Sequence, residues 1–344
     1  MKNKIFNTII VIVSTCIFLS FFLFTKGLNS LIRELKGLDM AWLTLSLLLM
    51  LLFWLFEMLV IYVITKKFYD VDNLVTISFK FEMIGQYFGA VTPYAAGSHP
   101  AQLYAMTENG IPAGTAGSIL MIKFMIHQIT NIVILISAFL FKFSYFNSKV
   151  SYFIYFFTSG IIVHVIILIF IMLFSINRRL TSTILIFLSK VLKKLRLIKD
   201  TKSIQKKIET ELENFHGNIS LLRANIKMCI HASILTIFQW LAFFSIPYCI
   251  YRSFGYNSSD IFTIIAAQIF LINFMAIIPL PGAEGGAEGG FYLINSLFFK
   301  GSTIITAIFI WRLLTYYFSI VVGIIFTLLV PNMKFKKHKK GISS

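Results

Sequence analysis

The chain has 344 residues, of which 58% are hydrophobic and only 13% are charged, and its formal net charge is +17. Soluble domains carry roughly 25% charged residues, and no soluble fold buries so much apolar surface. The composition therefore excludes an ordinary soluble protein and indicates an integral membrane protein.

Six apolar stretches are long enough to cross a bilayer as helices, because a hydrocarbon core of about 30 Å needs roughly 20 apolar residues. They cover residues 5–25, 40–65, 119–141, 152–175, 228–251 and 302–330. The first stretch follows a basic N-terminus, but its length and the lack of a small-x-small cleavage site predict a retained helix. Cys16, Cys229 and Cys249 lie in these spans without a C-x-x-C spacing, so we expect neither a disulfide nor a metal site, and no cofactor.

A first interrupted stretch covers about residues 74–111. The residues around its break are Pro93, Gly97, Ser98, His99, Pro100 and Gln102. The prolines bracket the break, the glycine permits a positive φ, and the others supply polar groups. A helix that restarts near Ser98 would direct unpaired N–H groups to the middle of the bilayer, where they could hold an anion. The alternative is a tight turn that satisfies its own polar groups and binds no ligand.

Polar side chains also occur inside the third span. Lys123, His127 and Gln128 lie at positions i, i+4 and i+5, on one side of a helix. We expect this side to face a central cavity, with bonds between helices as the alternative. Glu57 and His164 stand alone in apolar stretches, and we interpret them as packing residues.

The segment 176–225 is strongly basic, with 11 Lys and Arg residues, and the tail 334–344 carries five lysines. By the positive-inside rule we expect both in the cytoplasm, together with the N-terminus and Lys66-Lys67, in a plasma-membrane protein whose basic face attracts anionic lipid. Nucleic acid is not an expected partner. Apolar residues at helical spacing predict an amphipathic helix on the cytoplasmic surface. They are Ile204, Ile208, Leu212, Phe215, Ile219 and Leu222.

A second interrupted stretch covers about residues 261–300 and holds a Pro/Gly-rich run with two carboxylates. Its characteristic residues are Pro279, Pro281, Gly282, Glu284, Gly285 and Glu288. Proline removes a backbone donor and each glycine weakens a helix by about 1 kcal/mol, so a helix breaks here. Freed backbone and carboxylates are tolerated at membrane depth only where protein buries them or water reaches them. The run therefore predicts a polar site inside the membrane protein.

Arg312 lies about ten residues into the last span, too deep for its side chain to reach the interface easily. We expect it to pair with Glu288 or Glu284, or to hold a lipid phosphate with its planar guanidinium. A structural ion pair and a substrate contact both remain open.

The order of these segments predicts an internal repeat within a single membrane domain of residues 1–344. Residues 1–145 read as span, span, broken segment and span, and residues 146–333 repeat this order in the opposite orientation, with the basic loop inserted. This is an inverted-topology repeat, in which paired broken segments mark the central site of a transporter. We prefer re-entrant hairpins, although segments that cross fully as two short helices fit the same topology.

The residues at the two breaks and in the last span carry a family resemblance. They are Thr92-Pro93, Gly97-Ser98, Pro100, Gln102, the run 281–288 and the run 311–317. The chain closely resembles the membrane region of the lysylphosphatidylglycerol synthase/flippase family over nearly its whole length. Glu288 matches the family's glutamate and Arg312 its arginine. Ser98 and His99 depart from the pattern, and Glu284 is an extra carboxylate, which leaves the substrate open.

The resemblance implies an all-α, eight-helix-like flippase region. Its function would be to move a phospholipid such as aminoacylated phosphatidylglycerol, with links to lipid metabolism and to resistance against cationic antimicrobial peptides. Because we expect the soluble aminoacyltransferase domain of two-activity members to be absent, the partners would be membrane phospholipids. A separate lipid-modifying synthase and a second copy of the chain are further candidates. The alternative function is a phosphatidylglycerol lysyltransferase or glycosyl-lipid enzyme that acts with a separate catalytic partner.

Overall fold

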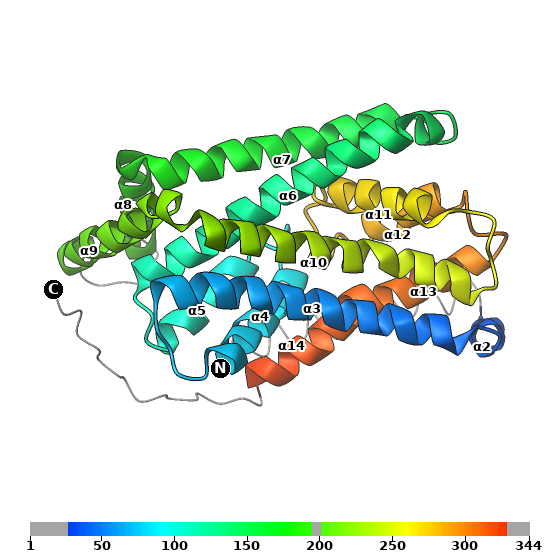
Figure 1. Cartoon of the computed structure of the whole chain (residues 1–344), viewed down its shortest axis with the longest axis horizontal. Coiled ribbons are helices and arrows are strands. Elements are labelled where there is room, and N and C mark those ends of the chain that lie inside the picture. The colour runs from blue at the N-terminus through cyan, green and yellow to red at the C-terminus, as the bar shows by residue number, and fades with distance from the viewer. Residues whose placement is uncertain (1–26, 195–200, 329–344) are drawn as a thin grey trace.

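The computed structural model describes residues 27–194 and 201–328, and this part of the chain is built from helices (Figure 1). In chain order they are α2 (Leu28–Lys36), α3 (Met40–Phe68), α4 (Leu74–Ala90), α5 (Ser98–Glu108), α6 (Ala113–Asn147), α7 (Phe153–Ile176), α8 (Arg178–Lys194), α9 (Thr201–Ser220), the short 3₁₀ helix η1 (Arg223–Asn225), α10 (Ile226–Ser253), α11 (Ile261–Met275), α12 (Gly286–Asn295), α13 (Thr303–Arg312), the π-helical turn η2 (Leu313–Tyr317) and α14 (Phe318–Leu328).

Five helical runs are long and apolar enough to cross a membrane. They are α3, α6, α7, α10 and the continuous run from α13 to α14, and they confirm five of the six predicted spans. The remaining predicted span, 5–25, lies outside the described residues. The chain is thus an all-α, multi-pass membrane protein.

Both interrupted stretches are helical hairpins whose two ends lie on the same side of the molecule. The hydroxyl of Tyr69, just before α4, donates to the carbonyl of Gly110, just after α5, at 2.9 Å. In the second hairpin, Tyr256 precedes α11, and its hydroxyl lies 3.1 Å from the hydroxyl of Thr303, the first residue of α13. A segment that crossed the bilayer fully would separate its two ends, so both hairpins are re-entrant.

The tips of the two hairpins meet in the middle of the bundle. Pro93 and Pro281 form an antiparallel β-bridge, and Pro281 follows Pro93 by 188 residues (281 minus 93). The same shift takes Ser98, the first residue of α5, onto Gly286, the first residue of α12. It also aligns the starts of α3 with α10, α4 with α11, and α6 with α13 to within two residues. The described helices therefore repeat with one common register.

The backbone conformation of the two tips repeats as well. Tyr94 and Ala95 have φ values of 54° and 54°, and the residues 188 positions later, Gly282 and Ala283, have 57° and 53°. Such left-handed conformations are uncommon for residues other than glycine, so their repetition at equivalent positions is unlikely to arise by chance. The two tips therefore have the same turn conformation at equivalent positions of the two halves.

The two halves are inverted with respect to each other. Helices α3 and α10, which the register makes equivalent, lie side by side and run in opposite directions (Figure 1). The amide of Asp39, before α3, donates to the carbonyl of Ser253, at the end of α10, at 2.9 Å. We call the end of the bundle that holds Lys66, Lys67, α8 and α9 the basic end, and the end that holds α2 and Tyr256 the opposite end. The first hairpin enters from the basic end and the second from the opposite end.

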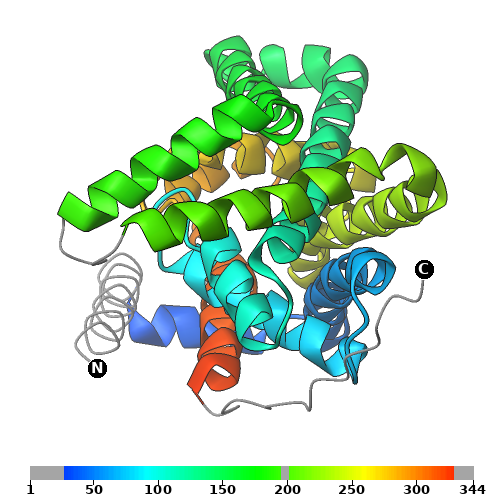
Figure 2. The same ribbon diagram turned by 90° about the vertical axis from the view of Figure 1, so that its left-hand side faces the viewer.

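The basic segment 176–225 forms two helices that cross the basic end (Figure 2). The predicted amphipathic helix exists as α9, and part of its apolar face packs against the bundle. Leu212 and Phe215 are buried, and the Phe215 ring contacts Phe174 of α7 at 5.9 Å between ring centroids. Glu211 accepts a bond from the amide of Gly114 at the start of α6. The contact of this helix with the cytoplasmic membrane surface stays a prediction.

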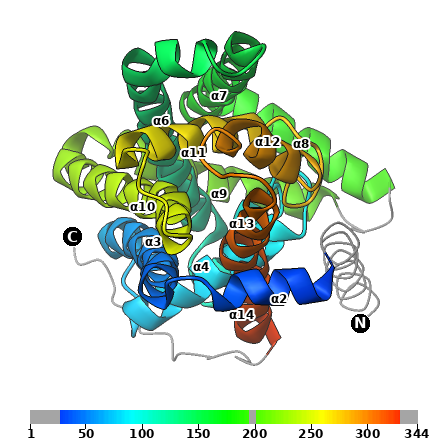
Figure 3. The same ribbon diagram turned by 90° about the vertical axis from the view of Figure 1, so that its right-hand side faces the viewer.

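A shorter helix, α2, crosses the opposite end (Figure 3). Its Glu34 accepts hydrogen bonds from the hydroxyls of Ser302 and Thr306 at the start of the last span. These bonds tie α2 to the start of α13, which follows the second hairpin in the chain.

Candidate functional site

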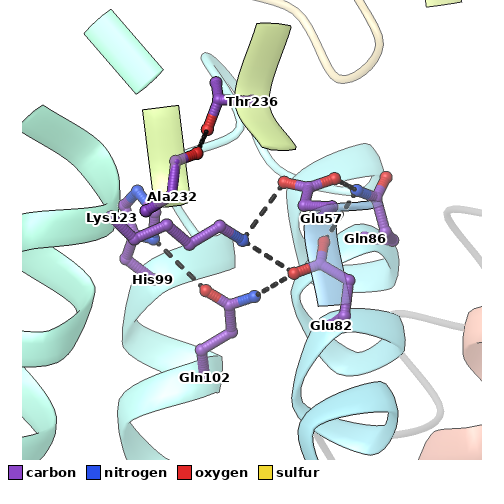
Figure 4. A network of polar contacts seen from close by, with 8 residues as sticks. All are labelled: Glu57, Glu82, Gln86, His99, Gln102, Lys123, Ala232 and Thr236. Atoms are coloured by element: carbon purple, nitrogen blue, oxygen red, sulfur yellow. Dashed lines mark hydrogen bonds and ion pairs between the residues drawn. The ribbon is translucent and has the colours of Figure 1, made fainter. Parts of the chain in front are cut away.

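Two groups of buried charges lie close to the meeting hairpins, one in each half. The first, which we call the Lys123 cluster, consists of Glu57, Glu82 and Lys123 (Figure 4). The Lys123 ammonium lies 2.7 Å from Glu82 Oε2 and 3.2 Å from Glu57 Oε1. The exposed fractions of Glu57, Glu82 and Lys123 are only 8%, 1% and 4%. Three helices, α3, α4 and α6, therefore meet at one ionic contact inside the bundle.

Two glutamine side chains surround the Lys123 cluster with further donors. Gln86 Nε2 donates to Glu57 Oε2 at 2.7 Å and to Glu82 Oε1 at 2.9 Å. Gln102 of α5 donates to Glu82 Oε2 at 3.2 Å, and its carbonyl oxygen lies 3.4 Å from His99 Nδ1. Gln102 fits because Gly85 has no side chain, since a Cβ at Gly85 would overlap the Gln102 amide. The cluster thus links the first hairpin to both flanking spans.

These contacts correct two expectations drawn from the sequence. Lys123 faces neighbouring helices and not an open cavity, because Glu57 and Glu82 enclose it. Glu57 is not an isolated packing residue, since it belongs to this ionic contact. The position of Glu57 in the middle of a predicted span could have indicated this ionic contact, because a carboxylate is costly at that depth unless a cation is near.

His127 and Gln128 also bond between helices. The His127 ring lies 4.6 Å from the ring of Trp240 on α10, and Gln128 Oε1 lies 3.0 Å from His164 Nδ1 on α7. His164 is therefore not isolated either. The sequence left two alternatives for this polar face, a cavity lining and bonds between helices. The contacts of His127 and Gln128 agree with bonds between helices.

The second group of charges, which we call the Arg312 cluster, lies against the tip of the second hairpin. Arg312 Nε donates to Glu288 Oε1 at 2.5 Å, and Nη1 donates to the carbonyl of Gly282 at 2.9 Å. The other oxygen of Glu288 accepts from the amide of Gly285 at 2.7 Å. The predicted pairing of Arg312 with Glu288 is thus present, and Glu288 also closes the first turn of α12.

One nitrogen of the Arg312 guanidinium, Nη2, has no partner among the described residues. The side chain is buried, since Arg312 is 2% exposed. The guanidinium carbon lies 4.7 Å from the ring centroid of Tyr316, whose hydroxyl donates to the carbonyl of Ala90 at 3.2 Å. Arg312 therefore joins the second hairpin, the π-helical turn and the end of α4. A buried, unpaired donor of a charged group is costly unless a ligand or water takes it.

Next to these buried charges, the tips of the hairpins are open. In the first tip, residues 93–96 are exposed, and Tyr94 has 60% of its surface free. In the second tip, Pro279, Leu280 and Gly285 are exposed. Irregular backbone is tolerated at membrane depth only in a protein interior or beside water, so exposed tips in mid-bundle indicate access for water or a polar ligand.

The remaining predicted site residues lie at these tips and at the helix starts that follow them. Gly97 donates its amide to the hydroxyl of Thr92 at 2.8 Å, so the first break satisfies part of its own backbone, as a tight turn would. Ser98 and His99 begin α5 and are half-buried. Glu284 lies on the second tip, also half-buried. Helices α5 and α12 both start at the bridge, so their positive dipole ends converge there.

The two clusters occupy related places in the two halves. The 188-residue shift takes Lys123 of α6 onto Trp311, one residue before Arg312 on the equivalent helix α13. Each half therefore presents one basic side chain at the same level of its last span, and each basic group contacts a carboxylate of its own hairpin. The carboxylates lie at unrelated positions, on α4 in one half and on α12 in the other.

Comparisons with known proteins agree with this architecture. A family model described as "Lysylphosphatidylglycerol synthase TM region" matches residues 8–323. A protein of Archaeoglobus fulgidus described as "UPF0104 membrane protein" is 23% identical over 260 residues, which cover 72% of this chain and 74% of the relative. No solved structure matches the chain.

Proposed function

The chain belongs to the family of the lysylphosphatidylglycerol synthase transmembrane region, and from this premise we propose that it is a lipid translocator. It would move a phospholipid, such as an aminoacylated phosphatidylglycerol, between the two leaflets of the plasma membrane. The basic end would face the cytoplasm, because α8, α9 and Lys66-Lys67 concentrate positive charge there.

The observation that carries this proposal is the Nη2 donor of Arg312. Arg312 Nη2 is buried and has no partner within residues 27–194 and 201–328, and it lies next to two exposed hairpin tips and two converging helix N-termini. A phosphate oxygen is the natural acceptor for such a donor, because a guanidinium fork and helix starts both favour anions. In this proposal the lipid phosphate binds Nη2 while Glu288 and the Gly282 carbonyl hold the guanidinium in place. Glu284, on the same tip, is the carboxylate assigned to a cationic headgroup amine.

Movement would follow from the inverted repeat. The two halves meet through α3 and α10 and through the bridge between the tips. If the halves rock about this shared region, the site at the tips opens alternately to each side, as in other inverted-repeat transporters.

Transport in reconstituted vesicles tests the role of Arg312. Arg312→Lys keeps a positive charge beside Glu288, but one ammonium nitrogen replaces the planar fork whose separate nitrogens face Glu288, the Gly282 carbonyl and the phosphate. We expect the folded variant to move lipid roughly ten- to hundredfold more slowly, which corresponds to the loss of about 1.5–3 kcal/mol for a hydrogen bond to a charged group. Headgroup accessibility in each leaflet is the measurement, and Arg178→Lys, at an exposed ion pair with Glu213, is the matched control. Wild-type rates in Arg312→Lys would overturn the assignment.

A second assay separates translocation from the enzymatic alternative. The purified chain is supplied with phosphatidylglycerol and lysyl-tRNA, and aminoacylated lipid is measured by mass spectrometry. We expect no product. Synthesis of the lysyl lipid by the chain alone would replace the translocator with a transferase.

A further inference from the structure

The Lys123 cluster holds two carboxyl groups but only one ammonium. Two carboxylates, Glu57 and Glu82, face one ammonium, and all three side chains are almost fully buried. If every group is ionised, the cluster has a net charge of −1 deep in the bundle. Such a charge is expensive at membrane depth, so one further positive charge must accompany it.

The donors around the two carboxylates are unequal. Glu82 accepts hydrogen bonds from three side chains, Lys123 at 2.7 Å, Gln86 at 2.9 Å and Gln102 at 3.2 Å. Glu57 accepts from Gln86 at 2.7 Å and lies 3.2 Å from the Lys123 ammonium. Hydrogen bonds to the ionised form favour that form. The ionised form of Glu82 is thus stabilised by more donors than that of Glu57, which makes Glu57 the candidate for an added proton.

Other titratable side chains near the cluster do not offer the same compensation. His99 on α5 and His127 on α6 both interact electrostatically with Lys123, and His164 on α7 faces His127. A proton on any of these imidazoles would add positive charge next to an ammonium that is already charged. A proton on Glu57 neutralises the surplus negative charge directly.

A metal cation fits the cluster less well than a proton. Such ions require several oxygen ligands, and Lys123 already occupies the space between the two carboxylates. Within residues 27–194 and 201–328, no group of three or more His, Cys, Asp and Glu side chains is arranged to hold a metal ion. Because Glu82 and Lys123 are buried, a lipid headgroup has no access to them from the surface of the described residues.

We propose that Glu57 reversibly binds one proton from water and that this proton is coupled to lipid movement. Binding changes the cluster charge from −1 to 0 and removes one of the two carboxylates that hold Lys123. Glu57 lies on α3, which packs along α10 of the other half. A change in the charge of Glu57 therefore changes the electrostatic environment of a helix that joins the two repeats. The coupling rests on the proposed translocation, whereas proton binding at Glu57 does not.

Infrared spectroscopy of the purified full chain tests proton binding without a transport assay. Exposed carboxyl groups are ionised at neutral pH, so a carboxylic acid C=O band that shifts in D₂O reports a buried protonated group. We expect this band in the wild type, its loss in Glu57→Gln and its retention in Glu108→Gln, a change at an exposed carboxylate of α5. If Glu57→Gln does not fold, Glu57→Asp should move the band instead. Absence of the band in the wild type, or its persistence unchanged in the Glu57 variants, would overturn the proposal.

Transport under a pH gradient tests the coupling. In vesicles with lipid on both sides, a gradient should accelerate wild-type lipid movement in one direction, and Glu57→Gln should lose this response while Glu108→Gln keeps it. If the rate of lipid movement by the wild type is the same with and without the pH gradient, the coupling is wrong. A Glu57 band without any lipid movement would support the proton site and refute the translocator, so the two proposals fail separately.

Discussion

Pro93 and Pro281 occupy equivalent positions of the two repeats and face each other across an antiparallel bridge. A residue that contacts its own equivalent must lie beside the axis that relates the two halves, as at a two-fold interface. The pseudo-two-fold axis of this protein therefore passes between the tips of the two hairpins. The Arg312 cluster and the free surface of both tips adjoin this axis, where an inverted repeat has its central site.

The bridge predicts a cross-link between the two tips. Proline has no N–H, so the pair can only be of the non-hydrogen-bonded type, with Cα atoms about 4.5 Å apart. This separation lies within the about 4.4–6.8 Å that a disulfide needs. In a background without native cysteines, we expect Pro93→Cys/Pro281→Cys to form a disulfide on oxidation, detected as a linked peptide by mass spectrometry. Lipid movement should stop on oxidation and return on reduction.

The matched control for this cross-link is Pro93→Cys/Ser296→Cys. Ser296 lies at the far end of α12, about 15 Å from its start at the helical rise per residue. The control pair should stay reduced. Equal cross-linking in both pairs would show that the tips do not meet as described.

Re-entry of the hairpins predicts which positions share a side of the membrane. Asp72 and Glu108 flank the first hairpin, and Asn257 and Lys300 flank the second, all exposed. We expect single cysteines at Asn257 and Lys300 to react with an impermeant thiol reagent added to intact cells, and cysteines at Asp72 and Glu108 to react only after permeabilisation. If Asp72 and Glu108 label from opposite sides, the first hairpin crosses the bilayer fully and the topology is wrong.

Two glycines of the second tip provide a matched pair for stability. Both have a positive φ, 57° at Gly282 and 78° at Gly285, a backbone in which alanine is strained by about 1–3 kcal/mol. A Cβ at Gly282 would also overlap the ring of Tyr316, whereas a Cβ at Gly285 meets open space. We expect Gly282→Ala to be less stable than Gly285→Ala by a further amount of about 1–3 kcal/mol, the usual cost of overpacking.

Thermal midpoints in detergent, read by size-exclusion chromatography after heating, compare the two glycine variants. The displaced Tyr316 would also lose its bond to Ala90, so Gly282→Ala should loosen the contact between the halves. Equal midpoints would mean that Tyr316 does not pack against this glycine.

Removal of the Lys123 ammonium should destabilise the first half strongly. Lys123→Met leaves Glu57 and Glu82 buried without a cation, and breaking a buried ion pair in this way costs about 3–5 kcal/mol. Lys142→Met is the control, because Lys142 pairs at 3.5 Å with Asp260, whose side chain is 56% exposed. An exposed pair contributes only about 0–1 kcal/mol. A similar midpoint for the two variants would contradict the buried ionic contact.

The sequence alone determines the class of the protein and the position of its breaks. Spans of about 20 apolar residues can only be stable as helices in a bilayer, and the prolines and glycines near Pro93 and Pro281 interrupt any helix that reaches them. Both are local properties of the chain. The order of spans and breaks also follows from the sequence, and this order predicts an inverted repeat. The structure shows the repeat as helices and tips that recur 188 residues later.

Only the tertiary structure decides which charged groups meet. Lys123 lies 41 residues from Glu82 and pairs with it because α4 and α6 turn these faces toward each other. Arg312 meets Glu288, 24 residues earlier, because α12 begins at Gly286 and directs Glu288 back to its start, where it accepts from the Gly285 amide. Leu212 and Phe215 of α9 are buried in the bundle for the same reason. Periodicity fixes which residues share a face of a helix, whereas the partner of that face depends on how distant helices pack.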